Sequence, residues 1–305
     1  MLLIGSAFLL ALLVGSFLNV VIHRLPVMLD RQWRAQAEEM LAESGTAAPK
    51  LQVDPANPET SESPAPPAKY NLVTPRSACP HCGAAIHAHQ NIPVVSWLVL
   101  GGRCASCKAR ISPRYPIVEL ATALLSAAVV WRFGFHWQSV AALFVTWALV
   151  ALTVIDLDQQ ILPDVITLPL LWLGLLASLA WHAGLAPPLP TDPRSAILGA
   201  VAGYLSLWSV YWAFKLLTGK EGMGYGDFKL FGALGAWMGW QMLPLVLLLS
   251  AFAGAVVGIA LIVVRGRDRN VPIPFGPYLA AAGWIAMLWG PEIVGGYLAF
   301  AGLDR

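Results

Sequence analysis

Residues 222–229 read Gly-Met-Gly-Tyr-Gly-Asp-Phe-Lys, and long apolar runs lie on both sides of them. An ionisable side chain at the edge of an apolar membrane segment is costly to bury and is functional by default. Glycines permit unusual backbone conformations and let another chain come close. The stretch therefore predicts a membrane-embedded site at Asp227, in which Gly224 and Gly226 leave room for an extended substrate backbone.

The composition indicates a polytopic membrane protein. Of the 305 residues, 57% are hydrophobic and 12% are charged, whereas a soluble domain usually carries about 25% charged residues. The mean hydropathy is +0.65. We therefore expect an all-α polytopic membrane protein that is surrounded by the lipid bilayer and has no nucleic-acid partner.

Apolar runs of about 20 residues are long enough to cross a bilayer as helices, and we expect about eight of them. The first, residues 2–22, ends at the basic stretch His23-Arg24-Leu25-Pro26. The run 229–240 is short and rich in glycine, so a tilted or re-entrant segment is an alternative there. The other expected spans are 116–133, 137–155, 165–184, 196–217, 243–264 and 275–291.

The distribution of basic residues predicts the orientation. Eight spans with the N-terminus outside place sixteen of the nineteen Lys and Arg residues on the inner side, and cytoplasmic loops carry such an excess. The same orientation puts Asp156, Asp158, Asp164 and Asp227 on the cytoplasmic side.

One long polar region, residues 23–115, separates the first span from the membrane domain 116–305. Residues 29–43 fit either a short amphipathic helix on the membrane surface or a solvated segment. Residues 44–68 are rich in Pro, Ala, Ser and Glu, with almost no bulky apolar side chains, and this composition is typical of a disordered linker. The chain thus divides into a first transmembrane helix (1–22), a cytoplasmic insert and the membrane domain.

Four cysteines form two Cys-x-x-Cys pairs within residues 77–114 of the insert. Cys79 and Cys82 are followed, after a gap of 21 residues, by Cys104 and Cys107. This gap is just beyond the usual spacing of a four-cysteine zinc site, which is about 15–20 residues. A reduced cytoplasmic setting disfavours disulfides. We expect a structural zinc ion with all four positions filled; a redox dithiol and free cysteines are the alternatives.

A second acidic motif, Asp156-Leu-Asp158-Gln-Gln-Ile-Leu-Pro163-Asp164, leaves one apolar span and enters the next. Asp164, directly after Pro163, suits the start of a helix, which it would cap or whose positive end it would complement. Asp158 fits a water-facing position. Asp156 lies at the apolar boundary without such an explanation, so we expect it to face Asp227.

Two carboxylates a few ångströms apart cannot both ionise and therefore share a proton. The ionised carboxylate activates a water molecule, and the protonated one polarises the scissile carbonyl. This is aspartyl peptide hydrolysis, which needs neither a metal nor a covalent nucleophile. The alternative is that each aspartate only caps its own helix.

Taken together, these motifs resemble the type IV prepilin peptidases, the leader peptidase and N-methyltransferase family of bacterial inner membranes. The resemblance covers nearly the whole chain, and the motifs occur in the family's order. Besides the cysteine pairs and the Asp156 motif, it rests on Gly15-Ser-Phe-Leu-Asn-Val-Val-Ile-His-Arg-Leu-Pro26, Gly224-Tyr-Gly-Asp-Phe-Lys229 and Pro274-Phe-Gly-Pro-Tyr278.

The resemblance implies two reactions. Type IV prepilins and type II secretion pseudopilins are cut on the cytoplasmic side, after a glycine that ends a short basic leader. The new N-terminal residue is then methylated from S-adenosylmethionine. Asp156 and Asp227 are the implied catalytic pair; the implied supporting residues are Gly224, Gly226, Asp164 and Lys229.

The resemblance also links two residues of the insert, Gly102 and Arg103, with methylation. A Lys often occupies the second position in the family, and Arg keeps the charge but alters the donor geometry. The residues alone do not indicate a methyltransferase, because no Gly-x-Gly-x-x-Gly follows a strand and no soluble segment is long enough for a Rossmann domain. A peptidase without methyltransferase activity therefore stays open.

Two other classes remain as alternatives. A presenilin-like intramembrane protease shares Gly-x-Gly-Asp but expects Tyr before the other aspartate, where Ile155 stands here. A transporter with carboxylate relays would place its acids near the midplane and show inverted repeats, and no repeat is apparent. Glu221 either attracts the basic leader or is an ordinary surface residue.

Overall fold

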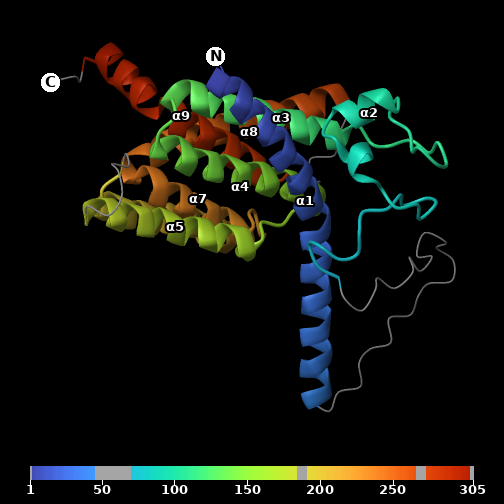
Figure 1. Cartoon of the computed structure of the whole chain (residues 1–305). Coiled ribbons are helices and arrows are strands. Elements are labelled where there is room, and N and C mark those ends of the chain that lie inside the picture. The colour runs from blue at the N-terminus through green and yellow to red at the C-terminus, as the bar shows by residue number, and fades with distance from the viewer. Residues whose placement is uncertain (1, 45–69, 184–190, 266–272, 303–305) are drawn as a thin grey trace.

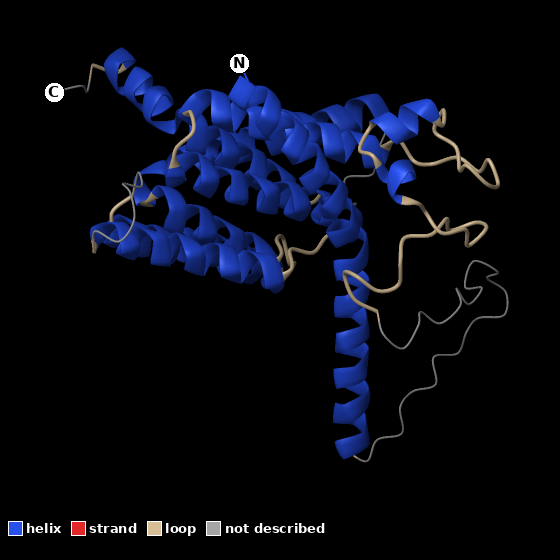
Figure 2. Cartoon of the chain, in the orientation of Figure 1, coloured by secondary structure: helices blue, strands red, loops and turns tan. Residues whose placement is uncertain are grey.

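The computed structural model describes residues 2–44, 70–183, 191–265 and 273–302. These residues form helices and loops without a strand (Figure 2), in agreement with the expected all-α class. The predicted linker lies outside the described residues apart from Ser44. The helices are α1 (Leu2–Glu43), η2 (Ala88–Asn91), α2 (Val95–Val99), α3 (Arg114–Phe133), α4 (Trp137–Gln159), α5 (Asp164–His182), α6 (Pro193–Thr218), α7 (Tyr225–Met238), η3 (Trp240–Met242), α8 (Leu243–Arg265) and α9 (Gly276–Phe300).

Each of the eight expected spans corresponds to one of the long helices. Six of the described helices are long and apolar enough to cross a membrane: α1, α3, α4, α5, α6 and the stretch that contains α8. Helix α9 is not among these six, and α7 has 14 residues, fewer than the roughly 20 that a bilayer core requires. The expected count of eight spans is therefore approximate.

The expected end of the first helix at Pro26 is wrong. Helix α1 continues through Pro26 to Glu43, so residues 29–43 prolong it and do not form a separate helix. Proline removes one backbone hydrogen bond and disfavours the turn before it. On both sides of it, Ile22, Leu25 and Leu29 are buried against residues of α3 and α4, and this packing holds the helix together. Beyond the bundle, the second half of α1 extends away by itself (Figure 1).

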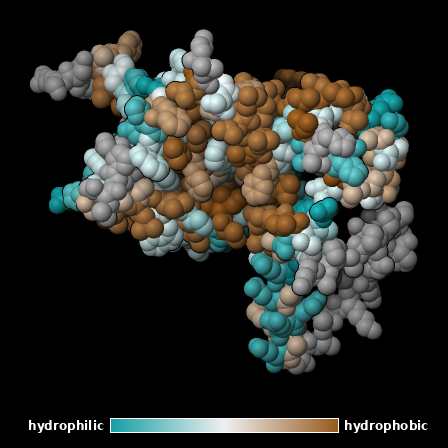
Figure 3. Space-filling view, in the orientation of Figure 1, coloured by the Kyte–Doolittle hydropathy of each residue, from teal (hydrophilic) through white to brown (hydrophobic). Residues whose placement is uncertain are grey.

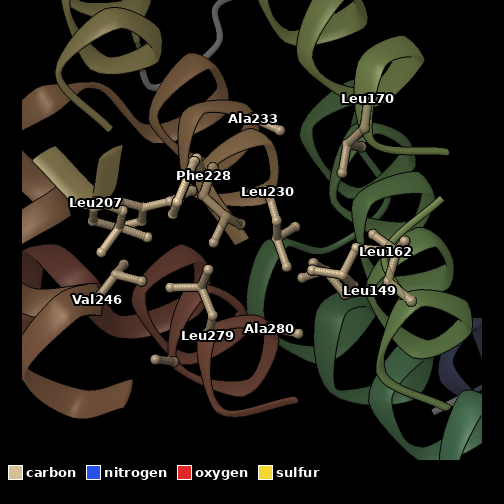
Figure 4. Close-up of a cluster of buried hydrophobic side chains, with 14 of the residues drawn as sticks. Leu149, Leu162, Leu170, Leu207, Phe228, Leu230, Ala233, Val246, Leu279 and Ala280 are labelled. Atoms are coloured by element: carbon tan, nitrogen blue, oxygen red, sulfur yellow. The ribbon is translucent and has the colours of Figure 1, made fainter. Parts of the chain in front are cut away.

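Helix α7 is the centre of the membrane part. Helices α5, α6, α8 and α9 all contact it, and nine of its 14 residues are buried. Figure 4 shows side chains of α7 between those of the surrounding helices. The cluster includes Phe228 and Leu230 of α7, Leu170 of α5, Leu207 of α6, Val246 of α8, Leu279 of α9 and Leu149 of α4.

Close backbone contact holds α7 against α6. A β-carbon on Gly199 would lie 2.3 Å from the carbonyl oxygen of Gly235, so neither position tolerates a side chain. Lipid tails are as apolar as leucine, so helices in a membrane associate through such close packing and not through the hydrophobic effect. The face of the bundle seen in Figure 3 is mostly apolar, whereas the projecting half of α1 is hydrophilic.

Candidate active site

The two predicted aspartates lie at one end of the bundle. Asp156 is in the last turn of α4, and Asp227 is in the first turn of α7. Both are buried, at 5% and 6% exposure. Leu162 lies beside both: it packs on Gly226, next to Asp227, and on Gly276, which touches Asp156. The structure therefore places at the same end of the bundle two carboxylates that are 71 positions apart in the sequence.

The surroundings of Asp156 are tight. A β-carbon on Gly276, the first residue of α9, would lie 2.5 Å from Oδ2 of Asp156. Despite this close approach, Oδ2 has no hydrogen-bond partner among the described residues. A buried carboxylate oxygen without a partner costs free energy in the folded state, and such groups concentrate at functional sites.

The two glycines before Asp227 differ in their surroundings. A β-carbon on Gly224 would approach only Oδ2 of Asp227, at 3.7 Å, so the space beside it is otherwise open. A β-carbon on Gly226 would lie 2.6 Å from Cβ of Leu162. The expectation that Gly226 leaves room for substrate is therefore wrong in this structure, because the Leu162 side chain fills that space. Gly226 instead permits close packing of α7 on the loop before α5.

An ion pair joins the beginnings of α5 and α7. Nζ of Lys229 donates to both carboxylate oxygens of Asp164, each at 2.7 Å. Asp164 does not cap its helix, because Pro163 occupies the N-cap position and no side-chain cap is formed. It lies in the first turn of α5, where a carboxylate complements the positive end of the helix. The Lys229 ammonium is a stronger partner for this carboxylate than the backbone N–H groups of the first turn.

A second ion pair connects the acidic motif to the insert. Asp158 pairs with Arg114, the first residue of α3. Asp158 therefore faces a cation and not only water. The pair ties the end of α4 to the point at which the insert returns to the membrane.

Glu221 is also engaged. Its Oε1 accepts a hydrogen bond from Nζ of Lys215 at 2.8 Å, and this bond holds the pKa of the Glu221 carboxyl below its usual range. The carboxylate is already neutralised by its partner, so a role in attracting a basic leader has little support.

The four cysteines converge as expected. The Sγ atoms of Cys79, Cys82, Cys104 and Cys107 all lie within 4.8 Å of one another, and all four are free thiols. The Cys79 and Cys107 sulfurs are 3.8 Å apart, which matches the edge of a tetrahedron of thiolates around Zn²⁺ with metal–sulfur distances of about 2.3 Å. The cluster can hold a metal ion.

The two Cys-x-x-Cys loops have the same backbone structure. In each loop, the backbone carbonyl of the first cysteine accepts a hydrogen bond from the backbone N–H four positions on. The donor is Gly83 in one loop and Lys108 in the other. Both residues have a positive φ, 68° and 60°. Backbone N–H groups of Cys107 and Ser106 lower the pKa of the Cys104 thiol to about 6, which favours the thiolate form that binds metals.

The structure does not unite the two methylation-linked residues with the aspartate pair. Gly102 is buried with a φ of +66°, and a β-carbon there would lie 2.9 Å from the Trp97 ring. Arg103 is exposed, and its backbone bridges to Arg110. The close Trp97 ring and the positive φ thus explain why glycine stands at position 102. The Arg103 side chain is exposed to solvent.

Two family models match the chain. The model of the bacterial peptidase A24 N-terminal domain matches residues 9–133, and that of the type IV leader peptidase family matches residues 143–259. A Pseudomonas aeruginosa protein named prepilin leader peptidase/N-methyltransferase is 57% identical over 96% of this chain and 93% of its own length. The chain belongs to the type IV leader peptidase family. Members of the same name from Stutzerimonas stutzeri and Xanthomonas campestris are 54% and 47% identical, over 97% and 96% of this chain and 94% of their own lengths. No solved structure matches the chain.

The sequence does not indicate the contacts of three buried residues. Gly276 lies in the Pro274–Tyr278 motif, but nothing in the sequence predicts that it touches Asp156. Glu119 is buried in α3 and accepts the N–H of Val94 at 2.7 Å. Arg24, also buried, donates to the carbonyls of Asn71 and Pro75. A charged residue within an apolar run was the available signal for Glu119.

Proposed function

We propose that this chain is a prepilin leader peptidase in which Asp156 and Asp227 form the catalytic pair. The observation that carries the proposal is the burial of two carboxylates, from the end of α4 and the start of α7, at one end of the bundle. Membership of the leader peptidase family supports the same reaction class. The substrates are type IV prepilins and type II secretion pseudopilins.

The pair supports a general acid–base mechanism. One carboxylate is ionised and removes a proton from water; the other is protonated and donates a hydrogen bond to the scissile carbonyl. The hydroxide adds to the carbonyl carbon, and the peptide bond then breaks as the leaving nitrogen takes up a proton. Oδ2 of Asp156, buried and without a partner among the described residues, is well suited to accept the proton of the attacking water.

The apolar outer surface of the bundle suits this substrate. A prepilin consists of a basic leader followed by an apolar helix, so its helix can lie among the membrane spans while the cleavage site reaches the aspartate pair. The open side of Gly224 offers space for the extended residues at the cut. We place the enzyme in the bacterial inner membrane with the pair and the insert on the cytoplasmic side, as the distribution of Lys and Arg favours.

Methylation of the new N-terminus is the second proposed activity. It rests on the names of the relatives, which include N-methyltransferase, and S-adenosylmethionine would supply the methyl group. Arg103, exposed next to the buried Gly102, is the charged residue of the insert that the family resemblance links with this reaction. We further propose that the cysteine cluster holds a structural zinc ion, because four thiolates leave no open position for water.

Cleavage of a synthetic prepilin peptide by the purified protein in detergent tests the peptidase proposal. We expect release of the leader in the absence of any ion gradient. A protein that moves protons or cations through carboxylates would leave the peptide intact under these conditions, and that result would reject the peptidase assignment.

Methyl transfer is tested separately with a peptide that already begins at the mature N-terminus. We expect incorporation of label from S-adenosylmethionine methyl groups into its terminal amine. Cleavage without incorporation would make the protein a peptidase alone.

A further inference from the structure

Helix α2 in the insert exposes three of its four apolar side chains; the fourth, Trp97, packs on Gly102. Val95, Leu98 and Val99 are 52%, 63% and 80% exposed, and their spacing of i, i+3, i+4 places them on one face. The buried residue of this helix is Ser96. This pattern is the reverse of a helix on a water-soluble domain, which buries its apolar face.

Glu119 fixes α2 at the level of the membrane helices. The N–H of Val94, directly before α2, donates to Oε2 of Glu119 at 2.7 Å. Val94 has a φ of 60°, which is rare for a β-branched residue, so the surrounding contacts hold it there. Glu119 lies five residues into α3, which begins at Arg114, and at 1.5 Å per residue this is about 7 Å inside the end of that helix.

The apolar face of α2 is therefore continuous with surface that meets lipid. Figure 1 shows α2 beside the end of α3 from which the insert departs. In this part of α3, Ile117, Leu120 and Leu124 are exposed, and α3 is one of the helices long and apolar enough to cross a membrane. Lipid that surrounds this end of α3 reaches the level at which α2 begins.

The charge of the insert fits an anionic surface. No Asp or Glu occurs between Glu62 and Glu119. Arg103, Lys108 and Arg110 follow α2 in the chain and are exposed, and none of the ion pairs among the described residues involves them. Basic residues beside an interfacial helix are attracted to anionic lipid headgroups.

We propose that α2 is an interfacial membrane anchor of the metal-binding insert. Val95, Leu98 and Val99 enter the headgroup boundary of the leaflet on the insert's side, and Arg103, Lys108 and Arg110 face its anionic headgroups. The anchor fixes the cysteine cluster against the membrane surface, near the end of the bundle that holds Asp156 and Asp227. Anchoring through α2 does not require that Asp156 and Asp227 cleave a prepilin.

Photo-crosslinking of the full-length protein tests the proposal. The photoreactive amino acid p-benzoylphenylalanine is placed at position 99 or, as a matched control, at position 73. Val73 is 82% exposed in the same insert, in a loop bound by Arg24. Arg24 lies nine residues along α1 from Gly15, which packs on Glu119, so this loop is about 13 Å along α1 from the level of Glu119.

The protein is reconstituted in vesicles of phosphatidylcholine alone or mixed equally with phosphatidylglycerol. We expect a phospholipid adduct at position 99 and none at position 73, with at least a two-fold higher yield in the anionic vesicles. A lipid adduct in equal yield at both positions, no lipid adduct at position 99, or an adduct there with a second copy of the chain would overturn the proposal. So would a yield that does not depend on phosphatidylglycerol.

Discussion

Oδ2 of Asp156 and Cα of Gly276 lie so close that a β-carbon on Gly276 would be 2.5 Å from the carboxylate oxygen. The start of α9 is thus a wall of the candidate site and fixes where the Asp156 carboxylate can lie. The same β-carbon would be 3.2 Å from Cδ1 of Leu162, so Leu162 contributes to this wall and also packs on Gly226.

The Gly276→Ala variant should lose cleavage while keeping its fold. The added methyl group displaces a side-chain carboxylate, which can rotate, and not backbone. A displacement of about 1 Å at a catalytic group can lower a rate by about 10²-fold, and we expect a loss of this order in initial cleavage rate. Thermal unfolding should change little.

The matched control is Gly254→Ala in α8. A β-carbon there would meet the Tyr278 ring at 3.5 Å, an ordinary contact, so its cleavage rate should stay near that of the parent. Equal rates for the two variants would show that Gly276 does not position Asp156.

The ion pair between Lys229 and Asp164 should affect activity more than stability. Its side chains are 27% and 52% exposed, and exposed ion pairs contribute at most about 1 kcal/mol to the free energy of unfolding. Lys229 follows Asp227 by two residues, so we expect Lys229→Met and Asp164→Asn each to slow cleavage by about 10-fold through misplacement of α7. The double variant should be no slower than either single one, and additive losses would contradict a shared role.

Metal removal tests the cysteine cluster. The purified protein should contain about one zinc ion per chain, and Cys82→Ser or Cys107→Ser should lower this ratio to near zero by elemental analysis. His81→Ala is the control: His81 is exposed between the first two cysteines and is not part of the cluster, so its variant should keep the metal. A parent protein that contains no metal would reject the zinc proposal.

The sequence alone predicts the cluster of four cysteines and the position of both aspartates at helix ends. Asp156 and Asp227 were placed together because carboxylates at the ends of apolar spans are rare and costly, and because an even number of spans separates them. Two Cys-x-x-Cys pairs similarly occur in few kinds of site, of which a four-cysteine metal site is one. In both cases a local pattern has one dominant physical explanation.

Other contacts between distant segments were not predictable in this way. Pro26 suggested a helix end, but burial of Leu25 and Leu29 outweighs the lost hydrogen bond. The glycine at position 226 suggests space for substrate, but the Leu162 side chain fills that space. The partner of Asp164 is Lys229, 65 positions away, and sequence reasoning could offer only the nearby backbone of its own helix.

The catalytic pair is tested most directly by conservative substitution of each aspartate. Asp156→Asn and Asp227→Asn keep the size of the side chain but can neither activate water nor share a proton. We compare initial rates of leader release for each, for the double variant and for Asp158→Asn. Asp158 ends the same helix but is partly exposed and paired with Arg114, so it is a matched control.

We expect each single variant of the pair to lose about 10³-fold or more of the cleavage rate, the double variant to be no slower, and Asp158→Asn to retain most activity. All variants should unfold at similar temperatures. Cleavage by Asp156→Asn or Asp227→Asn at a rate close to that of the parent would contradict the aspartate-pair mechanism.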